Sequence, residues 1–217
     1  MLYVKSYYSL LSSLLSVDDI VDLNIRNGNN YAVICDNTMY GTMEFIKKCK
    51  QKGIKPVIGL ELVIEDKVLL CYAKDYAGYL NLVKLSTKAN TSKVELTDIN
   101  TYKESLIIVI PYSNRELLEL ITTPLVYLGY KDEQEKNKAL EITKRVVFLK
   151  ECLYKEKKDA NYLKYLYLIR DGKSIYDEVS YDLLDKEFIN DKTCLEIVRE
   201  CNVTFPKASL LLPIYDC

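Results

Sequence analysis

The first chemical feature of this 217-residue sequence is that it contains no histidine. Histidine is the commonest general base near neutral pH, a frequent metal ligand and the usual partner of a serine or cysteine nucleophile. Ser-His-Asp, Cys-His and histidine–metal chemistry are therefore not available to this chain.

The cysteines and the short sequence motifs add no further chemical signature. The seven cysteines are odd in number and none belongs to a Cys-x-x-Cys pair, so neither a zinc knuckle nor a disulfide scaffold is indicated. We expect reduced thiols that pack as small hydrophobic side chains. The phosphate-binding loop, the dinucleotide-binding glycines, HExxH and GxSxG are also absent from the sequence.

Composition and charge indicate an ordinary globular protein. Hydrophobic residues make up 49% of the chain, charged residues 28%, and the net charge is −1. Such a balance gives no global electrostatic reason to bind nucleic acid or an anionic membrane. No apolar run approaches the ~20 residues that span a bilayer, and no signal peptide is evident, so we predict a cytoplasmic protein without a membrane partner. The 19 tyrosines are spread along the chain and do not predict a base-stacking surface.

Short apolar runs alternate with amphipathic stretches along the chain. Strands are predicted over Leu2–Lys5, Tyr31–Cys35, Pro56–Val63, Val68–Tyr72, Leu106–Ile110, Leu125–Gly129 and Arg145–Leu149. Helices are predicted over Ser16–Asn27, Thr42–Gln51, Ala77–Ala89, Arg115–Ile121, Asp132–Thr143, Asn161–Arg170 and Asp191–Cys201. This alternation favours an α/β fold in which helices cover parallel strands, and Glu65-Asp66-Lys67 predicts one hairpin.

One family resemblance is carried by a series of segments in order along the chain: Val4–Leu11, Met39–Gly41, Glu44-Phe45, Gly53–Glu61 (GIKPVIGLE), Leu69–Ala89, Ile169–Asp177, Cys194–Val203 and Leu212-Pro213. These segments resemble the PHP (polymerase and histidinol phosphatase) domain at the N-terminus of bacterial DNA polymerase III α subunits. Gly53–Glu61, for example, is similar to the family's GIKPIIGxE. The resemblance implies a PHP-type distorted (β/α)7 barrel over residues 1–204, with 205–217 starting the connection to the polymerase palm. Residues 113–144 carry little of it.

The resemblance also locates the positions where active family members hold a metal cluster on histidines and carboxylates. These positions fall on Tyr3, Lys5, Asp36, Asn37, Glu61, Glu151 and Leu153. A lysine ammonium among metal ligands repels a divalent cation. The resemblance therefore implies a degenerate site with no catalytic residue, no bound metal and no cofactor.

Lysine can take over the neutralising role of a metal in such a cavity. We expect Lys5 or Lys150 to form an ion pair with one of the three remaining carboxylates, Asp36, Glu61 or Glu151. The ordinary alternative is that these side chains face solvent, as most lysines and glutamates do.

A weaker alternative keeps one hard cation on oxygen ligands. Its ligands would be the same three carboxylates together with Cys35 or Cys152.

For function, the resemblance implies an inactive domain of a replicative DNA-directed DNA polymerase. Such a domain would pack against the palm and thumb of its own subunit, offer a surface to the proofreading exonuclease subunit, and meet DNA only through the parent polymerase. Apolar residues around Leu210–Ile214 are expected contacts. One alternative is a stand-alone metal-dependent PHP phosphoesterase or 3′–5′ exonuclease. Another is a free-standing binding module with the same fold.

Overall fold

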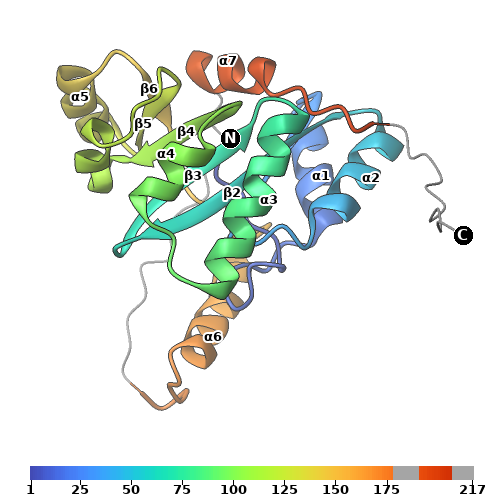
Figure 1. The fold of residues 1–217 in the computed structure, drawn as a ribbon. Helices are drawn as coiled ribbons and strands as arrows, with labels where there is room; N and C mark the ends of the chain where they lie inside the picture. The colour runs from blue at the N-terminus through green and yellow to red at the C-terminus, as the bar shows by residue number, and fades with distance from the viewer. Residues whose placement is uncertain (178–190, 207–217) are drawn as a thin grey trace, which may run out of the picture.

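The computed structural model describes residues 1–177 and 191–206, which form a mixed α/β fold around one curled sheet (Figure 1). Within the described residues, each strand of this sheet lies beside the next strand along the chain. The strands are β1 (Tyr31–Asp36), β2 (Lys55–Ile64), β3 (Lys67–Ala73), β4 (Leu106–Pro111), β5 (Val126–Tyr130) and β6 (Val146–Phe148).

Strand direction departs from the sequence prediction at β3. The pairs β1–β2, β4–β5 and β5–β6 are parallel, as predicted. β3 runs antiparallel to both of its neighbours, so the prediction of parallel strands is wrong at this strand. The predicted hairpin accounts for one reversal: Glu65 and Asp66 have φ values of 48° and 66°, the left-handed conformations of a tight two-residue turn.

The N-terminal segment connects the two edges of the sheet. The Val4 carbonyl accepts a hydrogen bond of 2.7 Å from the Cys35 amide at the end of β1. On its other side, the Lys5 amide donates to the Cys152 carbonyl, 3.3 Å away, in the segment that follows β6. The strand predicted over Leu2–Lys5 is reduced to one parallel bridge, between Val4 and Cys152. This short segment nevertheless brings the first and last strands to one site.

Helices cover the sheet and extend beyond it. They are α1 (Val17–Arg26), α2 (Thr42–Lys52), α3 (Tyr76–Thr91), α4 (Leu96–Tyr102), α5 (Glu133–Ile142), α6 (Ala160–Arg170) and α7 (Lys192–Glu200), with 3-10 helices η1 (Tyr112–Glu119) and η2 (Lys157–Asp159). Helices α1, α2 and α3 pack against β1, β2 and β3, whereas α6 projects from the body of the domain (Figure 1).

Local sequence signals set several of these boundaries. α1 begins after Ser16, whose hydroxyl accepts a hydrogen bond from the Asp19 amide while the Asp19 carboxylate accepts one from the Ser16 amide. Gly53 ends α2 with a left-handed φ of 69°. The sequence reading missed α4, which is short and rich in Thr, Asn and Asp, residues of modest helix propensity. The helix predicted over Arg115–Ile121 is instead a 3-10 helix, because its first five residues belong to η1, which ends at Glu119.

Strand alternation separates two faces of the core. On β1, Ile34 packs with α1 and α2, whereas Cys35 packs with Tyr3 and α7. Gly59 of β2 pairs with Cys35, so Glu61, two residues further along β2, faces the same side. The strand register therefore places a carboxylate beneath the N-terminal segment.

The end of the described chain packs on α3. The Phe205 ring lies edge-on to Tyr76 and Tyr79, with ring centroids 5.6 and 4.8 Å away. The predicted contact residues Leu210–Ile214, and residues 207–217 of the predicted connection, lie outside the described residues. The domain boundary after residue 204 stays a prediction.

Candidate functional site

Lys5 lies at the centre of a buried ion-pair cluster. Its ammonium nitrogen is 2.6 Å from Glu61 Oε2 and 3.0 Å from Glu151 Oε1. Lys5 and Glu61 are each 8% exposed, so this is not a solvent-facing surface pair. The prediction that a lysine pairs with a remaining carboxylate is confirmed, with Lys5 as the cation.

Three segments far apart in the sequence position this cluster. Lys5 lies in the N-terminal segment, Glu61 on β2, and Glu151 in the segment after β6. The backbone hydrogen bond from Lys5 to Cys152 holds the first and third segments together, and the bond between Cys35 and Val4 joins the first segment to β1, the neighbour of β2. The same contacts that connect the sheet edges therefore assemble the charges.

Tyr3 completes the cluster as a protonated hydrogen-bond donor. The Tyr3 hydroxyl donates a hydrogen bond to Glu61 Oε2, and the Tyr3 ring centroid lies 5.2 Å from the Lys5 ammonium. Burial, reinforced by the Glu61 and Glu151 charges, raises the pKa of Tyr3 well above its usual value, so the phenol stays a donor.

The pKa of Lys5 reflects two opposing effects. Burial alone would lower the pKa of Lys5, but the Glu61 and Glu151 carboxylates outweigh burial and the net shift is upward. Lys5 therefore keeps its positive charge throughout the physiological pH range.

Asp36 is satisfied separately, by a serine loop. Its carboxylate accepts hydrogen bonds from the Ser6 amide and the Ser6 hydroxyl, both 2.6 Å, and from the Ser9 hydroxyl, 2.7 Å. Burial still raises the pKa of Asp36 above its usual value, against these hydrogen bonds. We find no ion pair between Asp36 and Lys5 among residues 1–177 and 191–206.

Asn37 and Leu153 do not take part in the charge cluster. The Asn37 side chain is exposed. The backbone N–H of Asn37 donates to the Ser9 hydroxyl over 3.2 Å. Leu153 is buried in a small apolar cluster with Tyr154 and Leu163 of α6. The seven positions implied by the resemblance thus divide between an ion-pair cluster, a serine-bonded aspartate, an exposed amide and an apolar contact.

The donor set does not suit a divalent metal. In the described part of the chain, no group of three or more Cys, Asp or Glu side chains could hold a metal ion. The Lys5 ammonium lies between two of the acids that a cation would need, and the third is taken up by hydroxyl and amide donors. Burial also raises the pKa of the Cys35 thiol well above its usual value, which disfavours the thiolate that binds metals. The single-cation alternative gains no support from this geometry.

Sequence reasoning missed the serine loop. Ser6 and Ser9 are fully buried, and Ser13 donates from its hydroxyl to the Lys5 carbonyl over 2.7 Å. The available signal was the serine-rich run at positions 6, 9, 12 and 13, directly after the first implied ligand positions. Short polar side chains that return to a neighbouring carboxylate or carbonyl are typical of such tight loops.

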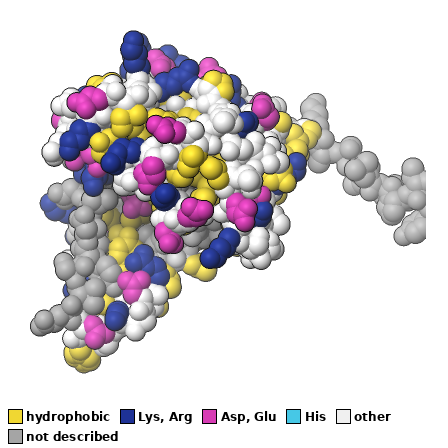
Figure 2. Space-filling model, turned by 60° about the vertical axis from the view of Figure 1, so that its left-hand side comes forward, with side chains coloured by type: hydrophobic (Ala, Val, Ile, Leu, Met, Phe, Trp, Pro, Cys, Tyr) yellow, Lys and Arg dark blue, Asp and Glu magenta, His cyan; other side chains and the backbone are white. Residues whose placement is uncertain are grey.

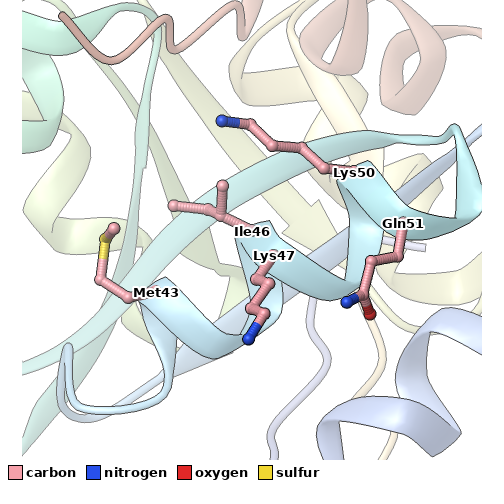
Figure 3. A pocket seen from close by; sticks show the side chains of 5 residues that line it. All are labelled: Met43, Ile46, Lys47, Lys50 and Gln51. Carbon is pink, nitrogen blue, oxygen red and sulfur yellow. The ribbon is translucent and has the colours of Figure 1, made fainter. Parts of the chain in front are cut away.

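Two cavities lie outside the charge cluster. One, of about 390 Å³, lies along α2 and is lined by Met43, Ile46, Lys47, Lys50 and Gln51 (Figure 3). The other, of about 350 Å³, is lined by Tyr7, Tyr8, Leu10, Asn37, Thr38 and Tyr40, next to the serine loop. On the face of the molecule seen in Figure 2, acidic and basic side chains are interspersed, without a continuous basic area.

The sequence matches a known domain class over most of its length: residues 2–160 fit the model of the PHP domain family. The chain therefore belongs to the PHP domain family. Among the helices of the described residues, none has the length and apolar character needed to cross a membrane.

Curated relatives are DNA polymerase III α subunits. The chain is 45% identical over 93 residues to that of Ureaplasma parvum, covering 42% of this chain and 10% of the relative. It is 36% identical over 123 residues to that of Halalkalibacterium halodurans, covering 52% and 11%. It is 27% identical over 176 residues to that of Streptococcus pyogenes, covering 79% and 17%. The matched region is thus a small part of each of these relatives.

Among solved structures, an inferred metal-dependent phosphoesterase from Bifidobacterium adolescentis aligns over 92% of this chain and 95% of its own. The identity is 10% and the TM-score 0.43, which is too low to support an inference.

Proposed function

We propose that this chain is the PHP domain of a bacterial DNA polymerase III α subunit in which an internal ion pair has replaced the metal centre. The observation that carries the proposal is the Lys5 ammonium between Glu61 and Glu151. An ammonium neutralises part of the carboxylate charge, but it offers no open coordination position for water. A site of this kind therefore cannot generate the metal-bound hydroxide that phosphoester hydrolysis uses.

The proposed contribution of the domain is structural. Its curled sheet, with the N-terminal segment acting as a seventh strand, would form the PHP-type distorted (β/α)7 barrel and pack against the palm and thumb of the parent subunit. The barrel would also offer a surface to the proofreading exonuclease subunit. The parent polymerase would be cytoplasmic, would carry out nucleotidyl transfer in its other parts, and would bring the domain to DNA. The small share of the relatives' length that the chain matches supports this part of the proposal.

An activity assay tests the loss of hydrolysis. The purified chain is incubated with p-nitrophenyl phosphate, or with a labelled single-stranded oligonucleotide, in the presence of Mn²⁺ or Zn²⁺. We expect rates equal to those of the Glu61→Gln variant, because any background comes from contaminants. Metal-dependent hydrolysis by the natural chain that Glu61→Gln abolishes would instead establish the stand-alone phosphoesterase or exonuclease.

The reading frame tests the proposed parent. We expect the coding sequence to continue beyond Cys217 into polymerase sequence. A stop codon directly after Cys217 would contradict this part of the proposal and leave the free-standing binding module.

A further inference from the structure

The cavity beside the serine loop has a composition unlike that of the charge cluster. Its volume of about 350 Å³ falls within the range of about 300–1,000 Å³ typical of small-ligand pockets. Three of its six lining residues are tyrosines, and the others are Leu10, Asn37 and Thr38. The tyrosines are spread along the sequence as a whole, but the fold gathers Tyr7, Tyr8 and Tyr40 here.

Two of the aromatic walls have a defined geometry. The Tyr7 and Tyr8 rings lie with their centroids 4.7 Å apart and their planes inclined by 33°. Tyr8 is held in place because its hydroxyl donates to Glu44 over 2.7 Å and its ring lies where a Cβ on Gly41 would be. Tyr7 and Tyr40 remain 41% and 72% exposed. Planar aromatic surface is thus available to a ligand ring at this pocket.

The pocket also contains polar groups without partners. The Asn37 side-chain amide makes no hydrogen bond within residues 1–177 and 191–206, so its donor and its acceptor can both serve a ligand. Thr38 Oγ1 is buried and lacks a hydrogen-bond partner among the described residues. If the Thr38 hydroxyl turns into the pocket, the polar edge of a ligand can form the missing hydrogen bond. A purely apolar ligand cannot do so.

Charge at the pocket favours a neutral ligand. Among the residues that the structure describes, no lysine or arginine lines it. Lys48, on the neighbouring helix α2, is held by Asp18 at 2.9 Å. A phosphate would find no cation here, whereas an uncharged ring with a hydrogen-bonding edge needs none.

We infer that the pocket of Tyr7, Tyr8, Asn37, Thr38 and Tyr40 binds a purine base. Stacking on tyrosine is sequence-tolerant and available to any base. The paired donor and acceptor of an asparagine amide match the N6 and N7 edge of adenine. The base can belong to a free nucleoside or to single-stranded DNA, and a free nucleoside and an oligonucleotide used as separate probes distinguish the two sources.

The test is a titration of the 217-residue chain followed by tyrosine fluorescence and by chemical shifts of the pocket residues. Adenosine is the neutral probe, and an oligo(dA) strand is the second arm. We expect saturable adenosine binding with a Kd on the order of 1 mM, independent of salt. If oligo(dA) binds each pocket as tightly as adenosine does, and its Kd is also independent of salt, a DNA strand presents its bases to the same pocket. Binding of adenosine alone assigns the pocket to free nucleosides.

Surface variants make the test specific. Tyr40→Ala and Asn37→Ala alter exposed side chains, and each should weaken adenosine binding about tenfold. Tyr162→Ala, at a 62% exposed tyrosine on α6, is the matched control and should leave the Kd unchanged.

Three results would overturn the inference. They are the absence of saturable adenosine binding, a Kd unchanged by both pocket variants, and binding of N-acetylphenylalaninamide at least as tight as that of adenosine. The last result would assign the pocket to an apolar side chain of a protein partner.

Discussion

Two carboxylates on neighbouring strands of this sheet are satisfied in different ways. Glu61, on β2, is 8% exposed and lies 2.6 Å from a lysine ammonium. Asp36, at the end of β1, is 2% exposed, and the donors to its carboxylate in the described part of the chain are all neutral: the Ser6 amide and the Ser6 and Ser9 hydroxyls. One acid is thus neutralised by a charge from the N-terminal segment, and the other is stabilised by hydrogen bonds from a loop folded over it.

The difference teaches that a buried acid can be accommodated without a metal by either route, with different consequences. A buried charge pair is costly to break, because removal of one partner leaves the other unpaired in a low-dielectric interior. Neutral donors stabilise an ionised carboxylate less than an ammonium does, which agrees with the raised pKa of Asp36. The following predictions test this contrast, from the largest expected effect to the smallest.

Lys5→Ala should be the most destabilising change. It leaves Glu61 and Glu151 close together without a cation, and we expect the free energy of unfolding at neutral pH to fall by about 3–5 kcal/mol. Urea denaturation followed by circular dichroism measures this. The matched control is Lys48→Ala, which removes an exposed pair with Asp18 and should cost less than about 1 kcal/mol. Equal losses in the two variants would show that the cluster behaves as a surface pair.

Alkaline pH should weaken the same cluster without a mutation. The folded-state pKa of Lys5 is raised, so its contribution is fully present below the unfolded value of about 10.4 and is lost as the pH rises through the folded pKa. Tyr3 acts in the same direction, because its pKa is also raised by burial and by Glu61. Stability measured by denaturation should therefore be flat near neutrality and fall above about pH 10. In Lys5→Met this fall should be shallower, because the contribution of Lys5 is gone, while Tyr3 and other buried groups with raised pKa values, such as Tyr72 and Cys71, still contribute.

Ser9→Ala should have a smaller effect, and one that depends on pH in the opposite sense. It removes one donor from buried Asp36, which we expect to cost about 1–3 kcal/mol at neutral pH. The lost bond favours the ionised carboxylate, so the cost should shrink as the pH falls through the pKa of Asp36 and the group is protonated. Denaturation of both proteins at neutral and acidic pH measures this difference. A cost that is the same at both values would mean that Ser9 acts through packing alone.

Addition of Mn²⁺ should have the smallest effect, essentially none. A site with a Kd of 10 µM would stabilise the fold by about 2.7 kcal/mol at 1 mM metal, which a thermal melt detects easily. We expect the Tm of the natural chain to stay unchanged in 1 mM MnCl₂, because the Lys5 ammonium lies between the acids. A clear upward shift that Glu61→Gln removes would restore the single-cation alternative.

Local signals in the sequence were sufficient for much of the fold. The Ser16 cap, Gly53 and the Glu65-Asp66 turn acted within a few residues of themselves, and the elements they delimit are confirmed. The direction of β3 against β4 could not be read in this way, because long connections between strands leave their relative direction open. α4 was missed for the opposite reason: its seven residues carry too weak a local preference to stand out.

For the site, the sequence by itself determined which groups were available: no histidine, three acids at the implied positions, and two candidate lysines, Lys5 and Lys150. It also predicted that a lysine would pair with an acid. Only the tertiary structure decided that the lysine is Lys5, that Asp36 belongs to Ser6 and Ser9, and that Tyr7, Tyr8 and Tyr40 share a pocket. The physical reason is that residue type limits what chemistry is possible, whereas the strength of a charge pair depends on distance and burial. Both are set by backbone contacts such as that of Val4 with Cys152, between residues far apart in the chain.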